Sequence, residues 1–148
     1  MEGFKWKVRV TGSSGKEGAV VHVRQHRFES GSAASFDVEH PEVSAVEYAL
    51  GAVGADVVAM LRAVCRERRI ALDAVEATVS GELGSAETYL NVVDAKGSPG
   101  LARAEVTVFV STMAAEPEVR EAWAEALRRS PLANTLGGIL NLELRVDI

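Results

Sequence analysis

One aspartate, Asp56, lies inside the most apolar segment of the sequence, residues 49–61. A carboxylate in such a segment must be paired, hydrogen-bonded or protonated, because burying an isolated charge is costly. Two interpretations follow from the residue type. Either a partner arginine or a backbone amide satisfies Asp56 structurally, or Asp56 holds a cationic or hydroxylated ligand in a pocket.

Glu47 and Ser130 could each serve either a site or the start of a helix. Ser44 precedes Glu47 by three residues ahead of the apolar run, which is the capping-box pattern. Ser130 followed by Pro131 is typical of an N-cap with proline at the first helical position. No histidine adjoins Ser130 in the sequence, which disfavours a serine hydrolase.

The sequence contains one cysteine, Cys65. A single cysteine excludes an internal disulfide, a CxxC redox pair and a thiolate zinc site. Cys65 follows Asp56 by nine residues, and at about 100° per residue the two point to opposite faces of a helix. We therefore interpret Cys65 as a small packing residue.

The other candidate clusters are basic. His22, His26 and His40 match no known spacing of metal ligands, so we expect neither a metal nor another cofactor. Four arginines crowd the end of the apolar segment, where they suit the negative pole of a helix. Because the whole protein is acidic, we favour a solvated helix end over a phosphate site for these arginines, Arg62, Arg66, Arg68 and Arg69.

A long helix must position Asp56, and the capping box predicts that it starts at Ser44 and ends near Arg68. This helix is apolar almost all round, so we expect it to be buried on every side. Small residues form one row that also contains Asp56, and larger ones form the opposite face. The small row is Ala45, Ala49, Ala52, Ala59 and Ala63, and we call it the alanine seam.

The remaining patterns predict strands and two further helices around the long one. The expected strands are residues 4–10 and 19–24, joined by a turn at 11–16, then 35–38, 71–83, 89–94, 106–110 and 140–148, and the expected helices start at Glu116 and Ser130. This order indicates a single α+β domain, residues 1–148, with a mostly antiparallel sheet. One such chain covers only one face of the long helix, so we predict a homodimer.

Composition bounds the function. The chain has 148 residues, of which 47% are hydrophobic and 25% charged, and its net charge is −5. These values are typical of a soluble globular domain and disfavour nucleic acid as a partner. The apolar run is too short to span a membrane, and the N-terminus alternates in polarity instead of forming a signal-peptide core. We therefore expect no membrane partner and a cytoplasmic protein.

Element order and two motifs resemble the OsmC/Ohr family of osmotically induced and organic-hydroperoxide-resistance proteins. The first motif is residues 44–56, which open the long helix, and the second is residues 130–136, Ser-Pro-Leu-Ala-Asn-Thr-Leu. The resemblance implies an OsmC-like α+β fold, with antiparallel sheets wrapped around a long buried helix in an intertwined homodimer. It also implies thiol-based reduction of organic hydroperoxides, regenerated by dithiols.

The resemblance places the two family cysteines at Asp56 and Ser130, and neither residue can form a sulfenic acid or a disulfide. Glu47 matches the glutamate that orders a catalytic arginine in the family. Asp56, Ser130 and Glu47 are thus the family-equivalent catalytic positions, and Arg27 and Asn134 are the candidate ligand-binding residues. Arg24 or Arg27 could meet Asp56 across the dimer.

Three functions stay open from the sequence. The favoured one is a stress-response family member that has lost thiol peroxidase chemistry. Such a protein binds a small-molecule ligand in an inter-subunit pocket or serves a stress-related accessory role. The alternatives are an enzyme that uses Asp56 and Glu47 for acid–base chemistry, and a hydroperoxide reductase that uses Cys65.

Overall fold

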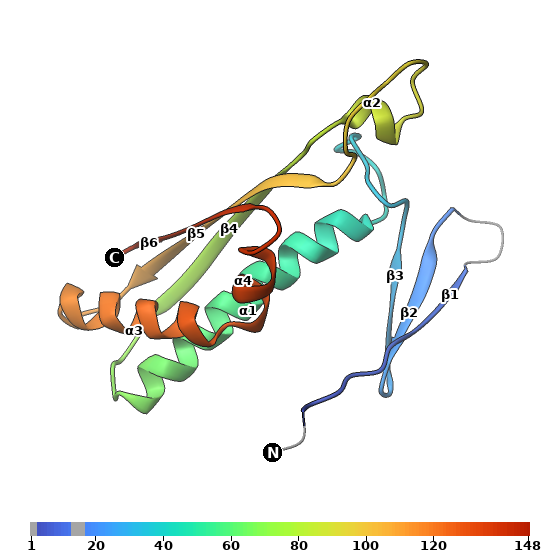
Figure 1. The fold of residues 1–148 in the computed structure, drawn as a ribbon. Helices are drawn as coiled ribbons and strands as arrows, with labels where there is room; N and C mark the ends of the chain where they lie inside the picture. The colour runs from blue at the N-terminus through green and yellow to red at the C-terminus, as the bar shows by residue number, and fades with distance from the viewer. Residues whose placement is uncertain (1–2, 13–16) are drawn as a thin grey trace. The chain divides into compact units, whose positions relative to one another are not determined.

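The computed structural model describes residues 3–12 and 17–148, which contain six strands and four helices (Figure 1). The chain divides into two units, residues 1–49 and 50–148, which we describe separately. The elements are β1 (Arg9–Gly12), β2 (Ala19–Val23), β3 (His26–Ser30), α1 (Ala45–Glu67), β4 (Ala74–Leu83), α2 (Ala86–Tyr89), β5 (Leu101–Ser111), α3 (Glu116–Arg129), α4 (Pro131–Leu136) and β6 (Asn141–Asp147).

The first unit contains an antiparallel sheet in the order β1-β2-β3. Two predictions were wrong here, because the first strand begins only at Arg9 and the predicted strand at 35–38 is a loop. The third strand is β3 instead, joined to β2 through Arg24, which has a left-handed backbone (φ 53°). Tight connections of this kind favour positive φ. Part of the predicted turn at 11–16 lies outside the described residues.

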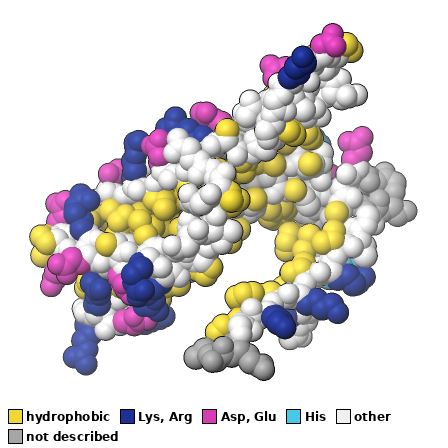
Figure 2. Space-filling model, viewed as in Figure 1, with side chains coloured by type: hydrophobic (Ala, Val, Ile, Leu, Met, Phe, Trp, Pro, Cys, Tyr) yellow, Lys and Arg dark blue, Asp and Glu magenta, His cyan; other side chains and the backbone are white. Residues whose placement is uncertain are grey.

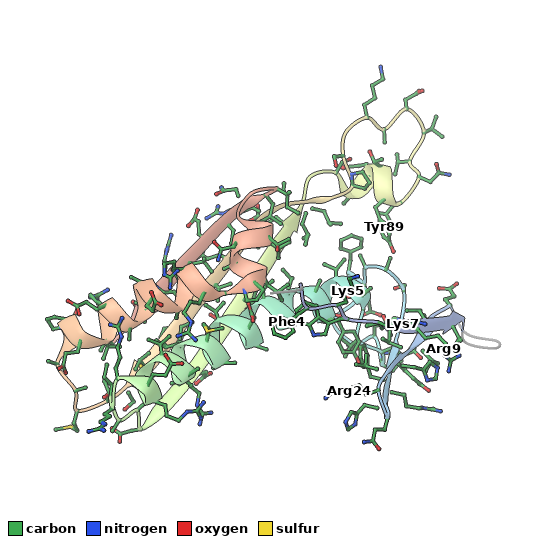
Figure 3. All side chains as sticks on the ribbon, turned by 60° about the horizontal axis from the view of Figure 1, so that its bottom comes forward. Phe4, Lys5, Lys7, Arg9, Arg24 and Tyr89 are labelled. Carbon is green, nitrogen blue, oxygen red and sulfur yellow. The ribbon has the colours of Figure 1, made fainter. Side chains whose placement is uncertain are left out.

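Large apolar side chains lie exposed on the first unit. Phe4 and Trp6 are 80% and 83% exposed, and Phe36 and Val38 are also exposed. Figure 2 shows apolar side chains at this surface, and Figure 3 shows Phe4 in the N-terminal segment that also carries Lys5 and Lys7. Among its described residues this unit has no buried apolar side chain, and such exposed apolar surface is typical of an interaction face.

The second unit contains a sheet in the order β4-β5-β6. β4 and β5 are antiparallel, whereas β5 and β6 are parallel, with Val106 opposite Leu144. Three of the four strand pairs are antiparallel, which agrees with the expected mostly antiparallel arrangement, and β5–β6 is the parallel exception. It arises because α3 and α4 carry the chain back across the sheet before β6 begins, as parallel neighbours require. The predicted strand at 89–94 was also wrong, since Tyr89 ends the short helix α2, which Ser85 caps, and turns follow in which Asn91 and Asp94 have positive φ.

One face of this sheet forms the core with α1 and α3. Val57 and Leu61 of α1 are fully buried, as are Val106 of β5 and Val119 of α3. These side chains repeat at helical spacing on α1 and α3 and at every second residue on β5, which confirms the predicted helix and strand periods. The core thus fixes the middle of α1, and with it Asp56, against the sheet and α3.

The other face of α1 is exposed within the single chain. Ala45, Ala49, Ala52 and Ala59 of the alanine seam are all exposed. A single chain therefore does not bury α1 on every side, although burial on every side was predicted from the sequence. By length and mean hydropathy α1 could span a membrane, but its large side chains belong to the core, as in the central helix of a soluble protein.

Candidate functional site

Asp56 and Ser130 are in direct contact, although 74 residues separate them. Ser130 Oγ donates a hydrogen bond to Asp56 Oδ2 at 2.5 Å, and the backbone N–H of Leu132 donates to the same oxygen at 3.0 Å. Ser130 is fully buried and Asp56 is half-buried. The two positions that the family resemblance singles out thus form one hydrogen-bonded pair, which we call the Asp56–Ser130 pair.

This pair also completes the start of α4. Ser130 Oγ accepts from the N–H of Ala133 at 3.1 Å, which confirms Ser130 as the N-cap. Pro131 has no N–H, and the N–H of Leu132 is taken by Asp56. The free donors of the first turn are therefore all satisfied, and a carboxylate stands at the positive end of the helix.

The second carboxylate oxygen of Asp56 is free of protein donors. Among the described residues, no hydrogen bond or ion pair reaches Oδ1. Asp56 also belongs to the exposed face of α1 that carries the alanine seam. Chemically, the site offers a fixed acceptor for a hydroxyl, an ammonium or a guanidinium group.

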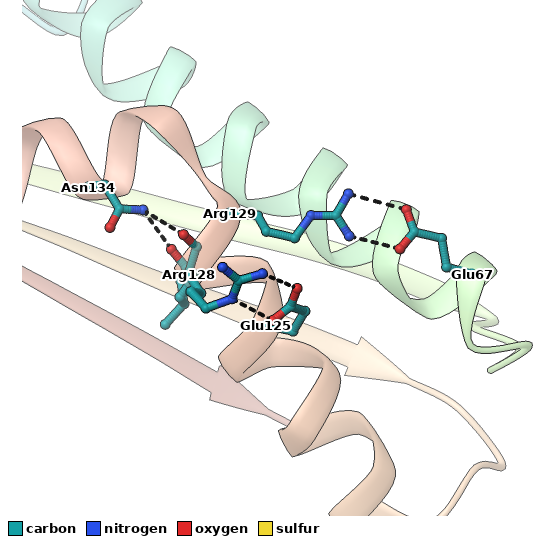
Figure 4. A network of polar contacts seen from close by, with 6 residues as sticks. Glu67, Glu125, Arg128, Arg129 and Asn134 are labelled. Carbon is teal, nitrogen blue, oxygen red and sulfur yellow. Dashed lines mark hydrogen bonds and ion pairs between the residues drawn. The ribbon is translucent and has the colours of Figure 1, made fainter. Parts of the chain in front are cut away.

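Asn134 binds the protein backbone (Figure 4). Its Nδ2 donates to the carbonyl oxygens of Leu127 at 2.9 Å and Ser130 at 2.7 Å, with a longer contact to Arg128. These carbonyls belong to the end of α3 and the turn that follows, where helix acceptors lack partners. Asn134 thus ties α3 to α4, and its amide hydrogens are engaged there.

Two ion pairs next to Asn134 were not predicted from the sequence (Figure 4). Arg129 of α3 pairs with Glu67 of α1 at 2.8 Å, and Arg128 pairs with Glu125 at 2.7 Å. The hydrogen bonds from these arginines lower the pKa of both glutamates. Spacing signals only the second pair, because the first joins two elements far apart in the sequence.

Glu47 forms a complete capping box with Ser44. Its Oε2 accepts from the backbone N–H of Ser44 at 2.7 Å and from Ser44 Oγ at 2.8 Å, and its own N–H donates back to Ser44 Oγ. The backbone hydrogen bond first, and the hydroxyl second, lower the pKa of Glu47 below its ordinary 4.5. The helix-start interpretation of Glu47 is therefore confirmed.

The capping box predicts an acid-sensitive contribution to stability. Because the pKa of Glu47 is lower in the folded chain than in the unfolded one, the ionised carboxylate stabilises the fold at pH values above the unfolded pKa. This stabilisation is lost as the pH falls through the lowered pKa of the folded state. We expect Glu47→Gln to reduce the loss of unfolding free energy between about pH 5 and about pH 3. Urea unfolding followed by circular dichroism at each pH measures this loss. Glu121→Gln is the control, since Glu121 is exposed and its side chain has no hydrogen bond or ion pair among the described residues; an equal change in both variants would contradict the prediction.

The other candidate residues differ in their own local contacts and burial. Arg27 lies on β3 and pairs with Glu29 at 3.5 Å, both side chains being exposed. Arg24 occupies the β2–β3 turn. Cys65 is 1% exposed in the core, which fits its interpretation as a packing residue, and burial raises the pKa of its thiol. Across residues 3–12 and 17–148, no three metal-ligating side chains gather.

Comparisons with known proteins agree on one family. The model of the family described as OsmC-like protein matches residues 38–145. A sequence search of curated proteins gave no match. Among solved structures, an OsmC-like protein from Mycoplasma pneumoniae shares 16% identity, with 97% of this chain and 96% of that chain aligned at a TM-score of 0.81.

Two hydroperoxide resistance proteins share the same fold. The protein OsmC from Legionella pneumophila is 16% identical, with 98% of each chain aligned and a TM-score of 0.70. OhrB of Bacillus subtilis is 15% identical over 97% of this chain and 98% of that chain, at a TM-score of 0.65. The predicted OsmC-like α+β fold is thereby confirmed.

Proposed function

The chain belongs to the OsmC-like protein family, and we propose that it is a member without thiol peroxidase activity that binds a small molecule at the Asp56–Ser130 pair. Organic hydroperoxide resistance is the named property of two proteins that share its fold. Reduction of a hydroperoxide by a cysteine pair proceeds through a sulfenic acid and a disulfide. Neither an aspartate nor a serine can supply these species.

The observation that carries this proposal is the 2.5 Å hydrogen bond between Ser130 Oγ and Asp56 Oδ2. The contact supports the assignment of these residues to the positions of the two family cysteines, because the side chains of two cysteines must also be in direct contact to form a disulfide. Positions 56 and 130 thus stay in contact, as a reactive cysteine pair would, but their side chains are a carboxylate and a hydroxyl that form a hydrogen bond. The ligand we infer is a hydroxylated or cationic small molecule, which Oδ1 of Asp56 can bind.

A partner chain would complete this site. The exposed alanine seam of α1 and the exposed Phe4 and Trp6 support a homodimer in which a second copy covers them. In that dimer, residues 1–148 act as one OsmC-like domain, and the pocket lies between subunits, with Arg27 available to it. Sedimentation equilibrium at the mass of one chain, 15.7 kDa, would contradict the dimer.

The two enzyme alternatives have weaker support. Acid–base chemistry would need Glu47 beside Asp56, whereas Glu47 is held by Ser44. Peroxide reduction by Cys65 would need an accessible thiolate, whereas the Cys65 thiol is buried and its pKa is raised. A protein that keeps its only cysteine as a thiol fits the cytoplasm, and recovery of the tagged protein in a periplasmic or secreted fraction would contradict that location.

Hydroperoxide reduction is the direct test. With tert-butyl hydroperoxide and dihydrolipoamide, we expect the wild-type chain to consume peroxide no faster than the buffer blank. Cys65→Ser should give the same rate, since the thiol lies in the core. Peroxide remaining over time is measured by the ferrous xylenol orange reaction.

Two outcomes would overturn the proposal. Turnover above the blank that disappears in Cys65→Ser would assign the activity to Cys65. Turnover that persists in Cys65→Ser but disappears in Asp56→Asn would show that the site catalyses the reaction without sulfur.

A further inference from the structure

A cavity lies at the C-terminal end of α1, within the unit formed by residues 50–148. Its volume is about 410 Å³, which is within the range of small-molecule sites. The lining residues are Arg62, Cys65, Arg66, Arg69, Ile70, Ala71 and Leu72. Among the described residues, no hydrogen bond or ion pair joins them to the Asp56–Ser130 pair, so this cavity is independent of the proposed function.

Three arginines give the cavity a concentrated positive charge. Arg62, Arg66 and Arg69 follow one another at helical spacing, and none makes an ion pair among the described residues. Arginines elsewhere in the same unit do have carboxylate partners, namely Arg103, Arg120, Arg128, Arg129 and Arg145. Like charges at this spacing repel each other. In this acidic protein, these three arginines therefore lack the carboxylate partners that neutralise the other arginines of the unit.

The negative pole of the α1 dipole explains why basic residues lie at the C-terminal end of the helix. It does not explain why they surround a cavity. The helix closes with Arg69 at φ 59° and a hydrogen bond from the N–H of Ile70 to the carbonyl of Cys65. This turn brings Ile70 and Leu72 back beside the arginines, and both pack against the core. The cavity therefore combines guanidinium groups with an apolar wall.

We propose that this cavity binds an amphipathic organic anion. Its carboxylate or phosphate group lies among Arg62, Arg66 and Arg69, since guanidinium groups bind both oxyanions through paired hydrogen bonds. Its apolar part lies against Ile70 and Leu72. Cys65 takes no redox part, because its buried thiol stays protonated.

Binding is tested by titrating the full-length protein, labelled with ¹⁵N, with phenyl phosphate, octanoate and inorganic phosphate in separate experiments. We expect saturable shifts of the amide signals of Ile70 and Leu72 with at least one organic anion, and weaker binding of inorganic phosphate. Arg62→Gln and Arg66→Gln should each raise the dissociation constant about tenfold, and glutamine preserves the helix.

Arg68→Gln is the matched control, because Arg68 belongs to the same run but does not line the cavity. Its dissociation constant should equal that of the wild type. Absence of saturable binding for both organic anions would overturn the proposal, as would equal weakening in Arg66→Gln and Arg68→Gln. Inorganic phosphate binding as tightly as phenyl phosphate and octanoate would contradict a role for the apolar wall.

Discussion

Asp56→Ala should lower the free energy of unfolding by about 2–4 kcal/mol, because it leaves two donors without their acceptor. These donors are the hydroxyl of Ser130, which is fully buried, and the backbone N–H of Leu132. Asp56→Asn keeps an amide oxygen that can accept from both donors, as Oδ2 does now, but it lacks the negative charge that strengthens these hydrogen bonds, so we expect a loss of about 1 kcal/mol. Urea unfolding followed by tryptophan fluorescence measures both changes.

Two comparisons isolate the pair. Asp73→Ala removes an exposed aspartate whose side chain has no hydrogen bond or ion pair among the described residues, and we expect a change within about 0.5 kcal/mol. A double-mutant cycle of Asp56→Ala and Ser130→Ala should give a coupling energy above about 0.5 kcal/mol, because the two side chains interact directly. If Asp56→Ala lowers the free energy of unfolding by less than about 0.5 kcal/mol, the carboxylate does not stabilise the start of α4.

Local sequence signals predicted the parts of this site that depend on neighbours in the chain. The capping box at Ser44 and Glu47 and the N-cap at Ser130 each involve residues three positions apart, so their types alone indicate the contacts. The long helix was predicted at 44–68 and is found at Ala45–Glu67, because its apolar spacing is uninterrupted. These features follow from helix geometry alone.

The partner of Asp56 could not be derived from local patterns. Its position in an apolar helix predicted that a partner or ligand must exist, but Ser130 and Leu132 are supplied by tertiary packing. Only the family resemblance indicated that positions 56 and 130 belong together. The parallel direction of β6 could not be derived either, because side chains alternate in the same way in parallel and antiparallel strands.

Placing cysteines at both positions should give the chain hydroperoxide reductase activity. In Asp56→Cys/Ser130→Cys the two sulfurs would replace side chains that now touch, so a disulfide can close after a small shift. One thiolate attacks the O–O bond, yielding an alcohol and a sulfenic acid. The second thiol condenses with the sulfenic acid, releasing water and forming a disulfide that dihydrolipoamide reduces. We expect peroxide consumption about tenfold or more above the wild-type background.

The matched control separates the pair from the mere presence of thiols. Ala59→Cys/Ser130→Cys also adds two cysteines, but Ala59 is an exposed residue of the alanine seam three positions after Asp56, whose side chain is the one that hydrogen-bonds to Ser130. This variant should stay at background, as should each single substitution, because no resolving thiol is within reach. A folded Asp56→Cys/Ser130→Cys protein that forms its disulfide yet reduces no hydroperoxide would show that the pocket around the pair no longer admits the substrate. The loss of activity would then extend beyond the two side chains, and the ligand of Asp56 would have to be sought among molecules unlike hydroperoxides.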